Sequence, residues 1–228
     1  MAQSICIFGD SVGKGIIFDS VKQKYVMSHT SFFDILAQRI GVAADNFCRF
    51  GCTLSKGAEL IDKKMATLSK YDYVLLEFGG NDSDFHWDEV AAAPDKAHEC
   101  NTPINTFISL YERVIQHLRN NGAKPVLVNL SPVDSERYYN WISRSNDGSA
   151  ILQFLREPRR IEHWNEMYNN AVWDIAGRHS VPVLDIRSPI LYERNFTDYF
   201  CEDGIHPNDA GQRLIADRLY TTLSFKET

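Results

Sequence analysis

The chain has 228 residues, 44% hydrophobic and 24% charged, a length and composition that favour one globular domain spanning residues 1–228. Its formal net charge of −6, without a dense run of Lys and Arg, argues against a nucleic-acid partner. No apolar stretch reaches membrane-spanning length, and no basic region precedes the short N-terminal apolar run, so neither a membrane anchor nor a signal peptide is expected.

The five cysteines are odd in number and lack the spacing of a metal site. We therefore expect free thiols and no bound metal, which predicts a protein of the reducing cytoplasm. Cys52 follows a glycine and is expected near the pocket, as a small lining residue rather than a nucleophile.

Short apolar runs alternate along the chain with helical patterns, starting from a run at residues 4–8. Richness in Val, Ile, Leu and Phe predicts strands buried on both faces at 4–8, 46–50, 71–78, 124–130 and 181–186. Helices are predicted at 31–40, 56–68, 103–121, 161–178 and 209–223. The alternation predicts a three-layer α/β fold, with a five-stranded parallel sheet in a flavodoxin-like order and helices on both faces.

Two connections, residues 83–102 and 131–158, are longer than this fold requires, and both leave the sheet at its carboxyl edge. Connections of such length carry short helices of their own or act as lids. We interpret them as walls of a substrate pocket, with aromatic lining residues Phe85, Trp87, Tyr138, Tyr139 and Trp141. The alternative is that these aromatic side chains only anchor the loops to the core.

Polar and glycine-containing motifs follow the first three predicted strands, and one more lies near the C-terminus. They are Gly9-Asp10-Ser11, Gly51, Gly80-Asn81-Asp82 and Asp203-Gly204-Ile205-His206. The carboxyl edge of an open α/β sheet is where ligands bind, so these residues are expected to meet there.

The serine turn fits two other motifs only in part. A phosphate-binding P-loop requires glycine and Ser/Thr where this chain has Phe8 and Gly15. The nucleophile elbow of α/β-hydrolases matches residues 9–13 formally, but that elbow follows several strands and only eight residues precede this one.

Taken together, the four motifs resemble the SGNH (GDSL-like) hydrolase family in order and spacing, from residue 9 to residue 207. The resemblance implies that Ser11 is the nucleophile, His206 the general base and Asp203 its orienting carboxylate. It further implies an oxyanion hole made by the backbone N–H groups of Ser11 and Gly51 and by the side-chain amide of Asn81, with neither metal nor cofactor.

The expected function is therefore that of a serine esterase acting on a small-molecule ester through an acyl-enzyme on Ser11. The aromatic loops favour a short- or medium-chain ester or an acylated carbohydrate over a long-chain lipid. Transfer of the acyl group to another alcohol would use the same intermediate. The alternative from another class is a non-catalytic flavodoxin-like module that binds phosphate or a nucleotide at the turn from Gly9 to Gly15.

Overall fold

The structure is a computed structural model and describes residues 4–28 and 30–224. Its main sheet has five parallel strands in the order β4-β1-β5-β6-β7. The strands are β1 (Ser4–Gly9), β4 (Ala43–Asn46), β5 (Tyr73–Glu77), β6 (Pro125–Val128) and β7 (Val183–Leu184). Numbered along the sheet-forming strands alone, this order is 2-1-3-4-5, which confirms the predicted flavodoxin-like arrangement.

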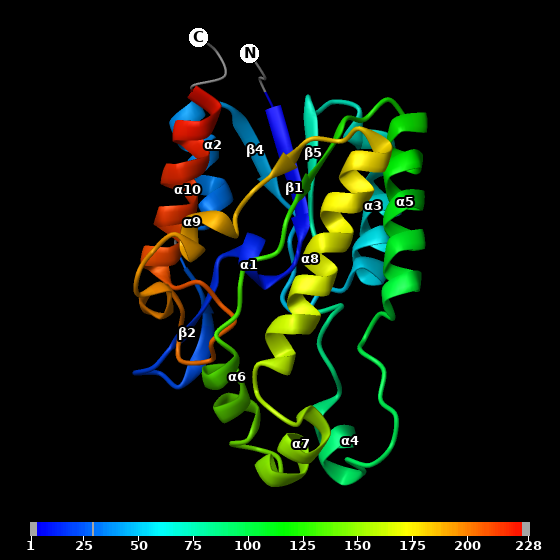
Figure 1. The fold of residues 1–228 in the computed structure, drawn as a ribbon. Coiled ribbons are helices and arrows are strands. Elements are labelled where there is room, and N and C mark those ends of the chain that lie inside the picture. The colour runs from blue at the N-terminus through cyan, green and yellow to red at the C-terminus, as the bar shows by residue number, and fades with distance from the viewer. Residues whose placement is uncertain (1–3, 29, 225–228) are drawn as a thin grey trace.

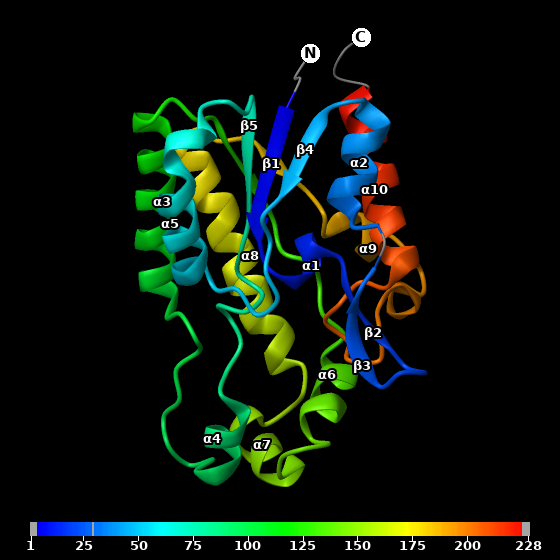
Figure 2. The ribbon, with the colours of Figure 1, turned by 180° about the vertical axis from the view of Figure 1, so that it is seen from behind.

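Helices cover both faces of the sheet, as Figures 1 and 2 show. One face carries α2 (Phe32–Ile40), α9 (Ser188–Leu191) and α10 (Asp209–Ser224), and the other carries α3 (Leu54–Leu68), α5 (Ile104–Asn120) and α8 (Arg160–His179). Alternate residues of the strands feed the two cores. In β1, Cys6 and Phe8 pack toward α3, α5 and α8, whereas Ile7 packs toward α2 and α10.

Further helices lie beyond the carboxyl ends of the strands (Figure 1). They are α4 (Trp87–Ala92) in the first long connection, and α6 (Ser135–Ile142) and α7 (Gly148–Leu155) in the second. Their apolar side chains form a third cluster, which includes Val90, Ile142, Ile151 and Leu155 and is separate from the cores on the sheet. Both connections thus carry short helices of their own, one of the two possibilities that their length suggested.

An antiparallel hairpin of β2 (Ile16–Asp19) and β3 (Lys24–Met27) stands outside the main sheet, and the sequence analysis missed it. Its turn is closed by the Asp19 carboxylate, which accepts hydrogen bonds from the backbone N–H groups of Val21 and Lys22. Two β-prone runs separated by four residues were the available signal.

The second strand was placed too late in the sequence. It begins at Ala43 and ends at Asn46, whereas the prediction covered residues 46–50. Ala43, Ala44 and Asp45 are exposed because the strand forms the sheet edge, so they lack the apolar pattern of a central strand. The apolar run that follows still tracks β1, since the Phe47 N–H donates to the Ile7 carbonyl at 2.9 Å.

The last helix is tied to the beginning of the chain by Gln212, which is fully buried. Its side-chain oxygen accepts the Phe32 N–H at 2.7 Å, and its side-chain nitrogen donates to the Val12 carbonyl at 3.2 Å. Two short elements complete the chain, the helix α1 (Ser11–Lys14) after β1 and the 3₁₀ helix η1 (Phe196–Tyr199) before α10.

Candidate active site

The serine turn lies where β1 passes directly into α1. Asp10 caps this four-residue helix, because its Oδ1 accepts the Val12 N–H at 2.8 Å. Ser11 is the first helical residue and is 7% exposed, with its side chain on the wall of a cavity of about 280 Å³. The local turn therefore fixes the serine at the carboxyl edge of the sheet.

His206 reaches Ser11 from the loop between η1 and α10, across 195 residues of sequence. The His206 Nε2 lies 2.8 Å from Ser11 Oγ, and its Nδ1 lies 2.6 Å from Asp203 Oδ2. The carboxylate can only accept, so Nδ1 carries the proton and the Nε2 lone pair faces the hydroxyl. This geometry lets the imidazole take the Ser11 proton.

Asp203 is held by its own loop. Its Oδ1 accepts the backbone N–H groups of Ile205 and His206, each at 3.1 Å, while Oδ2 faces the imidazole. Burial opposes ionisation of this carboxyl, but the hydrogen bonds and charge of His206 outweigh it and hold the pKa below its ordinary value. The group is therefore an anion when His206 takes up a proton.

Gly51 and Asn81 line the same cavity as Ser11 and His206, from the loops after β4 and β5. Gly51 has a φ of +65°, a conformation that favours glycine. The Asn81 Nδ2 donates a hydrogen bond of 3.0 Å to Asp10 Oδ2. The structure thus places four residues of the predicted catalytic set, Ser11, Gly51, Asn81 and His206, on one cavity. The fifth, Asp203, is buried behind the His206 ring.

Sequence reasoning missed two aromatic neighbours of the histidine. The Phe50 ring stacks on the His206 ring, with centroids 6.1 Å apart and an interplanar angle of 9°. Tyr25 of the hairpin lies 5.2 Å from the same ring, and Trp141 lies 6.2 Å from Tyr25. Burial and the neighbouring Asp203 charge raise the Tyr25 pKa, so its phenol stays protonated. The signals in the sequence were Tyr25 within the β-prone run at 24–27 and the position of Phe50 directly before Gly51.

Three of the five predicted aromatic pocket residues, Trp87, Tyr138 and Trp141, line the cavity. The other two are not among its lining residues. Phe85 packs into the third cluster, with its ring 4.4 Å from that of Trp164, and the Tyr139 hydroxyl donates to the Gly148 carbonyl at 3.0 Å. Phe85 and Tyr139 therefore anchor the long connections, which was the alternative interpretation of the aromatic residues.

The far wall of the cavity holds a carboxyl group that sequence reasoning missed. Asp84 accepts hydrogen bonds from Trp87 Nε1 at 2.8 Å and from the Tyr138 hydroxyl at 2.6 Å. Burial raises the pKa of the Asp84 carboxyl, although these two hydrogen bonds favour its charged form. Asp10, Glu77 and Asp84 line the cavity, whereas none of the lining residues within the described ranges is a Lys or Arg.

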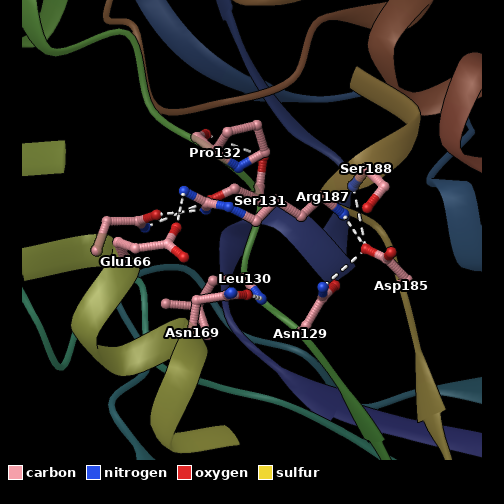
Figure 3. Close-up of polar contacts among 10 residues, drawn as sticks. Asn129, Leu130, Ser131, Pro132, Glu166, Asn169, Asp185, Arg187 and Ser188 are labelled. Atoms are coloured by element: carbon pink, nitrogen blue, oxygen red, sulfur yellow. Dashed lines mark hydrogen bonds and ion pairs between the residues drawn. The ribbon is translucent and has the colours of Figure 1, made fainter. Parts of the chain in front are cut away.

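A polar network joins the loop after β6 to α8 and to the segment after β7, as Figure 3 shows. Arg187 Nη1 donates to Asn165 Oδ1 at 2.6 Å and to the Ser131 carbonyl at 3.4 Å, and its Nη2 pairs with Glu166 at 2.7 Å. Asn165 and Ser131 line the cavity. The loop after β6 is thereby fixed against α8.

Among residues 4–28 and 30–224, no group of three or more His, Cys, Asp or Glu side chains is placed to hold a metal ion. Over the same residues, no helix combines the length and apolarity needed to cross a membrane.

Comparison with models of protein families gives a match over residues 7–214, to the GDSL-like Lipase/Acylhydrolase family. A comparison with curated protein sequences finds no match.

Several solved structures share the fold. A lipase/acylhydrolase from Enterococcus faecalis has a TM-score of 0.69 at 20% identity, covering 98% of this chain and 96% of that one. A lipolytic G-D-S-L family member from Veillonella parvula has a TM-score of 0.67 at 16% identity, covering 98% and 99%. The psychrotrophic esterase EstA from a Pseudoalteromonas species, in a structure inhibited by monoethylphosphonate, has a TM-score of 0.62 at 15% identity, covering 98% and 97%.

Proposed function

This chain belongs to the GDSL-like lipase/acylhydrolase family, and we propose that it cleaves short- or medium-chain carboxylic esters through an acyl-enzyme on Ser11. One observation carries the proposal. An unbroken hydrogen-bonded chain runs from Ser11 Oγ through the His206 ring to the Asp203 carboxylate, with contacts of 2.8 and 2.6 Å.

In the proposed reaction, His206 Nε2 takes the Ser11 proton as Oγ attacks the ester carbonyl carbon. The carbonyl oxygen becomes an oxyanion, which the N–H groups of Ser11 and Gly51 and the Asn81 amide would stabilise. Collapse of this intermediate returns the proton from His206 to the leaving alcohol. Water then repeats the sequence on the acyl-enzyme and releases the acid.

The cavity supports an uncharged, modest-sized substrate. Its volume of about 280 Å³ lies near the lower end of ligand pockets, which suits a short acyl chain better than a long one. Carboxyl groups and aromatic rings line it, so hydroxyl-rich alcohols such as acylated carbohydrates fit better than anionic esters. Asp84 is the group that would accept a hydrogen bond from such an alcohol.

The nucleotide-binding alternative is disfavoured at the turn itself. The N–H groups of Val12 and Gly13 already bind carboxyl oxygens of Asp10 and Glu77. The N–H groups of Lys14 and Gly15 bind backbone carbonyls. A phosphate would therefore meet occupied donors and two buried carboxyl groups.

We propose further that residues 1–228 form a single hydrolase domain that works in the cytoplasm. The five thiols are free, four of them buried and Cys100 half-buried, as suits a reducing compartment. A test of location would follow the tagged protein through cell fractionation, and recovery outside the cytoplasmic fraction would contradict it.

The decisive experiment is labelling with a fluorophosphonate and mapping of the adduct by mass spectrometry. We expect a covalent adduct on Ser11 that is lost in Ser11→Ala and strongly slowed in His206→Ala. Ser131→Ala is the matched control, because Ser131 lines the same cavity and should leave labelling intact. An adduct elsewhere, or none on active protein, would contradict the role of Ser11. A panel of p-nitrophenyl esters and acetylated sugars then ranks substrates.

A further inference from the structure

Two carboxyl groups are buried side by side beneath the serine turn. Glu77 is the last residue of β5 and pairs with Gly9, the last residue of β1. Asp10, which follows Gly9, therefore lies next to Glu77. Glu77 is 4% exposed and Asp10 is 2% exposed. Neither group has a part in the proton transfers described above, yet burying two acids together is costly.

The site of Glu77 is built around its carboxyl group. Its Oε2 accepts the N–H groups of Asp10 at 3.0 Å and of Gly13 at 3.2 Å, which ties the serine turn to β5. A Cβ atom at Gly9 or Gly13 would lie only 2.5 or 2.9 Å from that same oxygen. The two glycines therefore leave the space that the carboxyl group fills.

Asp10 links this pair to the oxyanion hole. Its Oδ1 accepts the Val12 N–H, and its Oδ2 accepts one hydrogen of the Asn81 amide at 3.0 Å. A carboxamide can turn either its nitrogen or its oxygen toward the cavity. Because Asp10 only accepts when it is ionised, the amide nitrogen is selected, and its second hydrogen remains for an oxyanion.

The charged groups around Asp10 and Glu77 indicate that the two carboxyl groups hold one proton between them. The carboxyl groups of Asp10 and Glu77 are in hydrogen-bonding contact, and within the described ranges neither has an ion pair with Lys or Arg. Two adjacent carboxylates repel, so one of them retains a proton. The titratable groups that face the pair from neighbouring elements are His206, Asp82, Cys48, Cys52 and Tyr111.

The hydrogen bonds indicate which group holds the proton. Burial raises the Asp10 pKa too, but the Asp10 oxygens accept from Val12 and Asn81 and lie near His206, all of which favour the anion. Burial and the neighbouring Asp10 charge raise the Glu77 pKa well above its ordinary value. Glu77 can keep Oε2 as acceptor for two N–H groups while its other oxygen bears the proton.

We propose that Glu77 is a positioning residue, whose neutral carboxyl group donates a hydrogen bond to the Asp10 carboxylate and thereby holds the Asn81 amide with its nitrogen toward the oxyanion. The inference rests on the proposed function, since it assigns the support of that same oxyanion hole. Asp10 relays the effect, and neither acid exchanges a proton with the substrate in the proposed reaction.

Reciprocal amide substitutions test it. In Glu77→Gln the new side chain accepts both N–H groups and still donates to Asp10, so it recovers the activity that Glu77→Leu loses, with kcat within about threefold of wild type. In Asp10→Asn an amide nitrogen faces Asn81, and kcat falls about 10²–10³-fold with little change in KM. Equal losses in Glu77→Gln and Asp10→Asn, or retention only in Asp10→Asn, overturn the proposal.

A double-mutant cycle separates positioning from general damage. If Asp10 acts through Asn81, then Asp10→Asn combined with Asn81→Ala is no slower than Asn81→Ala alone. Additive losses overturn the proposal. Hydrolysis and Ser11 labelling by the unmodified protein are measured first, so failure of the proposed function is recognised separately.

A spectroscopic measurement decides the matter even if Asp10→Asn does not fold. The infrared difference between wild type and Glu77→Gln at neutral pH should contain the carbonyl stretch of a protonated carboxylic acid. A difference spectrum with only carboxylate bands would place the proton elsewhere and overturn the proposal.

Discussion

The cavity has two halves that are built differently. The inner half consists of Ser11, Gly51, Asn81 and the loop of His206, each within a few residues of a sheet strand or of α10. The outer half comes from the hairpin and from the two long connections. The helices of these connections, α4, α6 and α7, lie beyond the ends of the strands (Figure 2), and their apolar side chains form a cluster of their own. The inner half can therefore hold atoms rigidly for chemistry, while the outer half can vary in shape without disturbing them.

The largest expected effect tests the inner half at Asp203. Replacing it by Asn leaves the shape but removes the anion that orients and stabilises the protonated imidazole, so kcat should fall about 10⁴-fold. Steady-state kinetics on a p-nitrophenyl ester measure this. Asp198→Asn, an exposed change just before the same loop, is the matched control and should leave kcat intact. A loss below tenfold in Asp203→Asn would remove it from the proposed set.

Asn81 and Asn146 compare the two halves directly, because both asparagines line the cavity. Asn81→Ala should lower kcat about 10²–10³-fold through loss of an oxyanion donor. Asn146→Ala, on the connection between α6 and α7, should change kcat by no more than about threefold and act chiefly on KM. Similar kcat losses in the two variants would contradict the proposal that the inner half carries out the chemistry while the outer half only shapes the cavity.

Tyr25 tests whether the hairpin supports the histidine. Tyr25→Leu removes the ring that packs against His206 and Phe50, and aromatic contacts of this kind contribute about 0.5–1.5 kcal/mol. We expect kcat/KM to fall about three- to tenfold. Val21→Ala at the hairpin tip, where the residue is 92% exposed, is the control. If both variants behave like wild type, the hairpin is only a rim of the cavity.

The smallest effect is expected at Cys52, which lies beside Gly51 but is 3% exposed. Burial raises the pKa of this thiol to about 11, so the reactive thiolate is scarce at neutral pH. Its fraction increases about tenfold per pH unit and levels off only as the pH nears that value. Iodoacetamide at pH 8 should neither label Cys52 in the native protein nor slow hydrolysis. The urea-unfolded protein, where the thiol regains its ordinary pKa, is the positive control. Rapid native labelling would contradict this account.

The sequence predicted the inner half well and the outer half poorly, for physical reasons. A strand that is buried on both faces carries an apolar run, as β1 and β5 do, and its motif follows immediately. The edge strand at Ala43–Asn46 has no such run because it is exposed. Which aromatic residue faces the cavity depends on how α4, α6 and α7 pack, so Trp87 could not be told from Phe85.

Contacts between distant segments were equally hidden. Tyr25 contacts His206 only in the folded chain, where the hairpin lies against the loop before α10. Local sequence patterns do not predict such a contact. Asp84 and Glu77 differ in kind from the motif residues, because their importance lies in burial, which the sequence does not display. Asp10 belongs to its motif locally as well, because its carboxylate accepts the Val12 N–H two residues away.

Ser11 and His206 are separated by 195 positions in the sequence, which has a consequence for the synthesis of the protein. The ribosome adds the hydroxyl first and the imidazole only after all the intervening residues. Over that interval the nascent chain holds the proposed nucleophile without its proposed base. We expect the two to pair once α10 has been synthesised and its Gln212 packs against Val12, the neighbour of Ser11.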